Sequence, residues 1–496
     1  MTILIDGGTV IGYKDGEHVM IPDGQVAYDA DRITFVGRGY QGEVEERIRA
    51  QGKLVIPGLI NHHMAFGVHM QLFRLDALPQ NFFNSSLGLG VQPEKAYHTS
   101  GPEAGDWRAS AAYAMAAALR TGTTTLVMVP NYGRHPFRGR LGSDQELVDL
   151  VAAFGLRAYL SLPYMSGGVS GRIDGSIEWE VREAEGWEGF EQAVDFARTF
   201  NGHDHDRIRT FLFPYQADNC TPELLQASKQ AAAELGCFIK IHVAQYLLEF
   251  HEMIRRTAKT PIQYLSDLGF LGPEVSLAHA IFTTVHPWLA YSADDDTDLQ
   301  LIVESGATVA HCPVIFARRG VALHSFSRYV RAGIPVSLGT DTSPHDMVLE
   351  MRTAALMSKL VDADATAGLA REAFDAATLG GARALLRDDI GRLSPGAKAD
   401  IVLVELNRTH LGPVAAVDPI KALVFCARGD DIDTVIVDGI QRVANGKLLG
   451  VDTGQLRTDA ELFNGKLQAS MAQARYKDRP LAEFFEPACP NWQEQS

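Results

Sequence analysis

The sequence predicts an α/β fold, in which a (β/α)8 TIM-type barrel is inserted in a small β-sandwich domain built from both chain ends. Eight short apolar runs alternate with amphipathic helical stretches through the middle of the chain. Both ends instead contain β-rich runs separated by turns. The chain has 496 residues, of which 46% are hydrophobic, and this is enough to bury the core of such a barrel.

The two ends of the chain are predicted to form one small β domain. In residues 1–56 the apolar runs are broken at GG, DG and DAD, which are typical turn sequences. Strand character returns in residues 391–455, in ADIVLVELN and DTVIVDGIQRV. The simplest topology pairs these two segments, so that the barrel, residues 57–390, is inserted between them. Residues 456–496 are expected to form a C-terminal helix and a polar tail.

The barrel segment contains eight candidate strands. They are VIPGLIN, TTTLVMV, LRAYLSLP, IRTFLFP, CFIKIHV, EVSLAH, ATVAHCP and IPVSLGTD. Intervening stretches such as TPELLQASKQAAAELG have helical periodicity and mostly end at a glycine, which is typical of a helix C-terminus. The long segment 75–106 separates the first strand from its helix, and a loop of this length is usually a lid or part of a site.

Charge and cysteine content limit the classes of function. The formal net charge is −16 and no block of lysine and arginine occurs, which argues against nucleic acid or an anionic membrane as a partner. The five cysteines are scattered without a CxxC pair, which favours reduced thiols in the cytoplasm and argues against a thiolate zinc site. No apolar run approaches a membrane span, and the first residues lack the pattern of a secretory signal.

Four polar residues stand at the ends of apolar strand-like runs. They are His63, His242, His279 and Asp341. Because the carboxyl ends of barrel strands meet at one face, these side chains are expected to converge. Imidazoles and a carboxylate are the groups that a divalent metal ion needs in order to bind and to activate water. The pattern therefore predicts a metal site at this face.

Further motifs surround these positions: PGLIN before a histidine, LRTGTTT, NCTPELL, IKIHVAQ, LAHA, VAHCP, LGTDTSPHDM, ATLGGARAL and GRLSPGAKADIVLVE. Through them the chain resembles the amidohydrolase superfamily over about residues 1–455, as a divergent member of the cytosine/guanine deaminase and triazine chlorohydrolase branch. The resemblance implies a metal-dependent hydrolase that acts on a small molecule. Such relatives are commonly dimers or larger, so a homo-oligomer is expected.

The resemblance assigns roles residue by residue. The family's first metal ligand falls on His63, the strand-five ligand on His242, and the strand-eight carboxylate, both ligand and proton acceptor, on Asp341. The strand-six histidine, which contacts the metal-bound water or the substrate in the family, falls on His279. The second histidine of the family's HxH motif should stand at position 65, where this chain has Ala65.

The missing histidine leaves the ligand set open. His63, His242 and Asp341 could suffice together with water, or His69 could add a nitrogen if its loop folds back. No lysine stands at the end of the fourth strand, where binuclear relatives carry a carboxylated lysine, so one divalent ion is expected. Zinc is favoured, and iron, manganese and cobalt also accept such ligands.

Two further departures from the family pattern fall in the expected pocket. Gln245 stands where the deaminases have glutamate, and Tyr215 where the family often has histidine. An amide can bind a substrate but cannot protonate a ring nitrogen. We therefore assign Gln245 and Tyr215 to substrate binding, with His345 as a further candidate, and consider His345 and Glu249 as substitute acids.

Functions from different classes stay open. The first is hydrolysis of an amide, carbamate or carbon–chlorine bond in a small neutral or aromatic molecule, with His279 and Asp341 as catalytic residues. The second is an aminohydrolase (deaminase) of a heteroaromatic ring with a replaced acid. The third is a metal-free binding or assembly protein on a decayed scaffold, which Ala65 and Gln245 favour and the intact polar residues oppose. A lyase that keeps the metal would use the same ligands.

Overall fold

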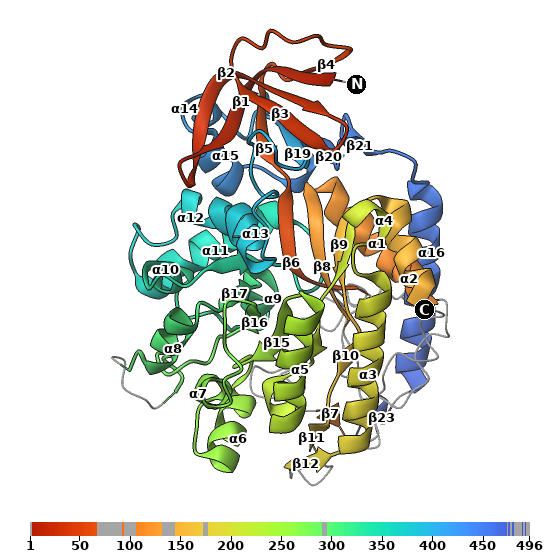
Figure 1. The fold of residues 1–496 in the computed structure, drawn as a ribbon, viewed down its shortest axis with the longest axis vertical. Coiled ribbons are helices and arrows are strands. Elements are labelled where there is room, and N and C mark those ends of the chain that lie inside the picture. The colour runs from red at the N-terminus through yellow and green to blue at the C-terminus, as the bar shows by residue number, and fades with distance from the viewer. Residues whose placement is uncertain are drawn as a thin grey trace.

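The structure is a computed structural model of the chain. It describes residues 2–66, 92–93, 106–130, 144–171, 177–289, 295–473, 475–476, 479–480, 489 and 492. His69 lies outside the described residues, as does most of segment 75–106. Figure 1 shows a β domain that contains strands from both chain ends, and below it a larger α/β body.

The β domain is one mixed sheet of nine strands. The strand order is β22-β21-β20-β19-β5-β1-β2-β3, and β4 pairs with β1. β5 and β19 join the two chain ends in antiparallel register, with Ile56 opposite Val402. The pairing does not divide these strands into two sheets, so a β-sandwich is not confirmed. The strands are β1 (Thr2–Lys14), β2 (Glu17–Asp29), β3 (Arg32–Gly37), β4 (Glu46–Arg49), β5 (Lys53–Pro57), β19 (Ile401–Glu405), β20 (Ile432–Val437), β21 (Ile440–Ala444) and β22 (Lys447–Leu448).

The larger body contains two four-stranded parallel sheets, with orders β13-β9-β8-β6 and β15-β16-β17-β18. Isolated parallel bridges connect the two sheets at both junctions, between Met64 and Asp341 and between Leu212 and Ile239. The arrangement is therefore of the predicted TIM-barrel type. The strands are β6 (Leu59–Phe66), β8 (Thr123–Pro130), β9 (Arg157–Leu160), β13 (Ile208–Thr210), β15 (Ile239–Val243), β16 (Val275–His279), β17 (Thr308–His311) and β18 (Val336–Leu338).

Short strands also lie outside these sheets. β11 and β12 form an antiparallel hairpin, and β7 pairs with β11. β10 pairs with β14, and β23 pairs with β24. Their bounds are β7 (Gln92–Pro93), β10 (Pro163–Tyr164), β11 (Gly167–Gly171), β12 (Ile177–Val181), β14 (Phe213–Pro214), β23 (Arg475–Tyr476) and β24 (Arg479–Pro480).

Helices alternate with the barrel strands and lie outside them (Figure 1). α5 shows why: it buries Leu224 and Ala231 on one face and ends at Gly236 in the left-handed conformation, as its sequence predicted. The helices are α1 (Asp106–Arg120), α2 (Asp144–Phe154), α3 (Glu183–Phe200), α4 (His203–Asp206), α5 (Pro222–Leu235), α6 (Leu247–Thr257), α7 (Pro261–Asp267), α8 (Thr297–Ser305), α9 (Pro313–Ala317), α10 (Phe326–Arg331), α11 (Met347–Asp362), α12 (Ala370–Asp375), α13 (Gly381–Ala384), α14 (Val414–Val417), α15 (Pro419–Phe425) and α16 (Thr453–Gln473).

The barrel strands are buried along their whole length where the site residues lie. All five residues of β15 (IKIHV) and of β16 (VSLAH) are buried, as expected for parallel strands covered on both faces. α16 packs against α1 at the side of the barrel (Figure 1). Among the helices that the structure describes, none has both the length and the apolar character to cross a membrane.

A buried ion-pair network connects the barrel to the β domain. The side chain of Arg157, on β9, is fully buried. Its Nε lies 2.9 Å from Oδ2 of Asp400, and its Nη2 lies 2.6 Å from Oδ1 of Asp438. Lys398 Nζ lies 3.1 Å from the same oxygen of Asp438. Charges of opposite sign that have lost most of their contact with water depend on one another, because each compensates for the solvation that the other has lost.

Replacing Arg157 with alanine should lower the free energy of unfolding by about 3–5 kcal/mol, because it leaves the buried carboxylate of Asp400 without its cation and Asp438 with Lys398 alone. Urea titrations followed by circular dichroism measure this change. Arg198→Ala is the control, since Arg198 and Asp195 form an exposed pair 3.5 Å apart and such pairs contribute at most about 1 kcal/mol. Equal, small losses in both variants would contradict the prediction.

Candidate metal site

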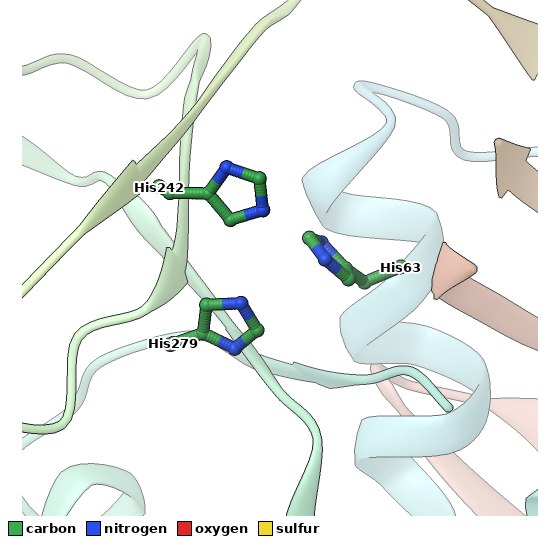
Figure 2. A group of neighbouring side chains, drawn as sticks. All are labelled: His63, His242 and His279. Carbon is green, nitrogen blue, oxygen red and sulfur yellow. The ribbon is translucent and has the colours of Figure 1, made fainter. Parts of the chain in front are cut away.

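Three histidines converge at the carboxyl ends of β6, β15 and β16. Each of His63, His242 and His279 is buried and offers a ring nitrogen, and these nitrogens all lie within 4.8 Å of one another. The ring centroids are 5.2 Å apart for His63 and His242, 4.8 Å for His63 and His279, and 5.3 Å for His242 and His279. Figure 2 shows the three rings turned toward a common space.

Strand pairing explains why these residues meet. β15 and β16 are neighbours in parallel register, with Val243 opposite His279, so the two strand ends lie side by side. The ends of β6 and β18 meet in the same way. The N–H of Asp341 donates to the carbonyl oxygen of His63 at 2.7 Å, and the N–H of Ala65 donates to that of Asp341 at 2.6 Å.

The hydrogen bonds of His242 determine which nitrogen can bind a metal. Its Nδ1 lies 2.7 Å from the carbonyl oxygen of Tyr215. A carbonyl can only accept, so Nδ1 carries the proton and Nε2 presents a lone pair. A metal-binding histidine typically has this arrangement.

The other two imidazoles contain buried nitrogens without a hydrogen-bond partner among the described residues. These are Nδ1 of His63 and both ring nitrogens of His279. Buried polar atoms are rarely left unpaired, because that costs free energy. A cation bound between the rings would account for the nitrogen of His63 and for one of the two nitrogens of His279, since one ion binds only one nitrogen of each ring. The donor set of three imidazoles therefore fits a divalent metal ion.

Burial also keeps these imidazoles neutral. It lowers the pKa of His242 to about 4, and it lowers the pKa values of His63 and His279 well below the ordinary value. Positive charges on neighbouring imidazoles and on Lys240 would add to the effect. Only the neutral imidazole has a free lone pair, so the site is in the form that binds metal.

Asp341 stands beside the three imidazoles. Its Oδ2 lies 4.0 Å from Nε2 of His279, and its side chain is 14% exposed. Burial raises the pKa of Asp341 to about 6, and the positive charge of Arg319 partly opposes this shift. The structure thus groups His279, which the sequence assigned to catalysis, with His63 and His242, and leaves Asp341 adjacent to them as a carboxyl group that can exchange a proton.

The predicted substrate-binding residues lie at different places. The Tyr215 ring packs 5.0 Å from the His242 ring, and burial raises the pKa of its hydroxyl. Gln245 is half-buried, and its backbone N–H donates to Glu249. His345 is buried at the junction of β6 and β18, with Nδ1 3.0 Å from Oγ1 of Thr340. It is outside the group of three imidazoles, so its part in substrate binding stays a prediction, as does the part of His69 in metal binding.

Two side chains near the imidazoles were not predicted from the sequence. The Phe316 ring, on α9, lies 4.8 Å from the His279 ring. Lys240, on β15, is fully buried, and its Nζ lies 3.2 Å from Nδ1 of His62 and 3.2 Å from Oγ of Ser276. Burial lowers the pKa of Lys240 to about 7. A lysine inside the apolar run CFIKIHV was the available signal for this buried polar contact.

Comparison with known proteins places the chain in a family. The model of the amidohydrolase family matches residues 54–443. The chain is 31% identical over 443 residues to a 5-methylthioadenosine/S-adenosylhomocysteine deaminase of Thermococcus kodakarensis, covering 88% of this chain and 93% of that one. It is 30% identical over 446 residues to a 5'-deoxyadenosine deaminase of Methanosarcina mazei, covering 89% and 93%.

Solved structures show the same fold. An adenosine deaminase from Xanthomonas campestris with bound zinc is 23% identical, with a TM-score of 0.77 over 94% of this chain and 98% of that one. An atrazine chlorohydrolase from Arthrobacter aurescens complexed with zinc is 22% identical, with a TM-score of 0.76 over 93% and 100%. The resemblance inferred from the sequence motifs is confirmed: the chain belongs to the amidohydrolase family and is a hydrolase that acts on carbon–nitrogen or related bonds.

Proposed function

We propose that this protein is a metal-dependent hydrolase in which His63, His242 and His279 hold one divalent cation. The group of three buried, neutral imidazoles with unpartnered nitrogens is the observation that carries the proposal. When bound, such a cation lowers the pKa of water and polarises the bond to be cleaved. Zinc is the proposed ion, because two similar solved structures contain it.

Asp341 is proposed as the proton acceptor. Its carboxyl group lies beside His279, and its pKa of about 6 suits a group that takes a proton from water and returns it to a leaving group near neutral pH. Tyr215 supports the site through its backbone, since its carbonyl oxygen holds the tautomer of His242. Its aromatic ring and the amide of Gln245 are proposed to line the substrate pocket.

The absence of a glutamate at position 245 limits which bonds this site can cleave. Gln245 cannot protonate a leaving group or a ring nitrogen. Glu249 is not directed at a substrate, because both of its oxygens accept backbone N–H groups. We therefore favour cleavage of an amide, carbamate or carbon–chlorine bond in a small molecule, which depends less on such an acid. A homo-oligomeric state and a cytoplasmic location stay predictions.

Deamination of a heteroaromatic ring is the second candidate. The names of the relatives favour it, since two proteins that are 30–31% identical over most of the chain are named as deaminases of adenosine derivatives. Asp341 would then carry every proton transfer, because no other described carboxyl group lies beside the imidazoles without a backbone N–H partner.

A substrate panel separates the two candidates. Zinc-loaded protein is incubated in ¹⁸O-labelled water with 5'-methylthioadenosine, a chloro-s-triazine, an aryl amide and an aryl carbamate. Hydrolysis must place ¹⁸O in the product. Ammonia released from the purine would establish the second candidate, whereas chloride or amine release would support the first. Protein that binds no metal, even after incubation with zinc, iron, manganese or cobalt, would overturn both.

Restoring the acid should favour deamination. We expect Gln245→Glu to raise ammonia release from a heteroaromatic amine by about 10²-fold, at the low end of what a general acid contributes. The measurement is kcat/KM for ammonia release by a coupled assay. Gln41→Glu, a change of the same kind at an exposed position of the β domain, is the control and should have no effect. No gain in the Gln245 variant would show that the missing acid does not limit the reaction.

A further inference from the structure

Glu249 is a buried carboxylate next to the metal site that the proposed chemistry does not use. It lies on α6 and is fully buried. Its Oε1 accepts the N–H of Ala244 at 2.9 Å, and its Oε2 accepts the N–H of Gln245 at 2.8 Å. Both hydrogen bonds hold the turn that directly follows β15, the strand that ends just after His242.

The same turn also holds the segment after His279. The carbonyl oxygen of Ala244 accepts the N–H groups of Ile281 at 2.9 Å and Phe282 at 2.8 Å. The carbonyl oxygen of Val243 accepts the N–H of Ala280 at 3.0 Å. The chain segments that follow two of the three imidazoles are therefore joined to each other through one turn, and Glu249 is the side chain that holds this turn.

Three residues where these two segments meet, here called the joint, have an unfavourable backbone conformation. Ala244, His279 and Ala280 have φ values of +50°, +77° and +45°. Residues with a Cβ rarely adopt this left-handed region, and they do so only where surrounding contacts outweigh the cost. Two hydrogen bonds to one fully buried side chain fix the N–H groups of Ala244 and Gln245 relative to each other. The two bonds to Glu249 are suited to hold this strained joint.

The surroundings of Glu249 keep its carboxylate in place. Gln216 and Asp218 lie near this carboxyl group, and the Gln216 backbone forms a bridge with His242. Burial and the nearby Asp218 carboxylate raise the pKa of Glu249, and the N–H groups of Ala244 and Gln245 oppose that shift. Glu249 is thus connected to His242 through the turn that directly follows β15.

We propose that Glu249 is a positioning residue that fixes His242 and His279 relative to each other and thereby sets the affinity of the site for its cation. This inference rests on the proposed function, because it concerns the same three imidazoles. The two hydrogen bonds also explain why Glu249, which is close to His242 in sequence, does not act as the missing catalytic acid.

Zinc affinity tests the proposal. We expect Glu249→Gln to weaken zinc binding by about 10–100-fold, the usual loss when a group that supports a metal ligand is changed. A glutamine oxygen can accept one of the two N–H groups, but its NH₂ group cannot accept the other. Affinity is measured by competition with a chromophoric chelator, and the visible spectrum of the cobalt-loaded protein should change as well. Glu252→Gln is the matched control, because Glu252 lies on the same helix and pairs with Arg255, 2.7 Å away.

A rescue variant separates positioning from general stability. Glycine adopts positive φ without a steric penalty, so Ala244→Gly should recover part of the zinc affinity when combined with Glu249→Gln. A purely structural role of Glu249 would lower the melting temperature of the metal-free protein without changing the cobalt spectrum of the molecules that are folded. Zinc affinity of Glu249→Gln equal to that of Glu252→Gln would overturn the proposal.

Amide hydrogen exchange in the wild-type protein tests the same idea if the variant does not fold. The N–H groups of Ala244 and Gln245 should exchange as slowly as those of β15, because a buried carboxylate accepts them. Fast exchange of both would overturn the proposal. A wild-type protein that binds no zinc would refute the proposed function itself, whereas binding that is insensitive to Glu249 refutes only this inference.

Discussion

Replacing His242 with alanine should remove the bound cation and lower hydrolysis by about 10³-fold or more, since metal activation of water supplies several kcal/mol of transition-state stabilisation. His242 presents a free Nε2 and is one of the three clustered imidazoles. Two remaining imidazoles cannot complete the tetrahedral coordination that zinc prefers in proteins. Elemental analysis of protein purified without chelator, beside kcat/KM on the active substrate, measures both effects.

Thermal stability gives a second measurement for the same variant. Metal that binds only the folded state stabilises it by about 2.7 kcal/mol at a free concentration of 100 times Kd. Zinc should therefore raise the melting temperature of the wild type but not that of His242→Ala, and a chelator should remove the difference. His251→Ala, an exposed histidine on α6, should behave as the wild type does. Full metal content in His242→Ala would contradict the three-imidazole site.

Replacing Asp341 with asparagine should lower kcat by about 10²–10⁴-fold, the range that a positioned general base contributes. The cation should be retained at about one per chain, because the three imidazoles remain. Asparagine keeps the shape of the side chain and tolerates the φ of +53° at this position. The expected result is thus a metal-loaded protein that binds substrate and turns it over slowly.

Metal content in this variant decides between two ligand sets. Asp23→Asn is the matched control, since Asp23 is exposed and also has a positive φ, +49°. Loss of metal from Asp341→Asn with normal metal in the control would show that Asp341 is a ligand, as the family resemblance implies. Retention with lost activity would assign Asp341 to proton transfer.

The barrel could be predicted because its signal is local. Runs such as CFIKIHV and EVSLAH are apolar throughout, and parallel strands covered on both faces need that pattern. The helices between them end at glycines such as Gly236, where the backbone turns left-handed. The form of the β domain was less accessible, because whether strands divide into two sheets depends on pairing between residues that are far apart in the chain, such as Ile56 and Val402.

Roles that depend on side-chain direction could not be predicted. Glu249 lies one helical turn beyond Gln245 in sequence and was a candidate acid. In the structure the chain turns at Ala244, so the carboxylate reaches back to the backbone instead of toward a substrate. His345 is close to Asp341 in sequence, yet its ring is buried against Thr340. Hydrogen bonds to local backbone and hydroxyl groups determined both positions.

By itself the sequence determined the alternation of strands and helices, the family and the strand-end positions of His63, His242, His279 and Asp341. These follow from periodicity and motifs that lie within a few residues of one another. Only the tertiary structure showed which of the four form the tight group. The neighbouring ends of β15 and β16 place His279 beside His242. Asp341 follows β18 and has a left-handed backbone conformation, and its carboxyl group lies next to the imidazoles. That arrangement depends on how distant strands pair, which no local pattern encodes.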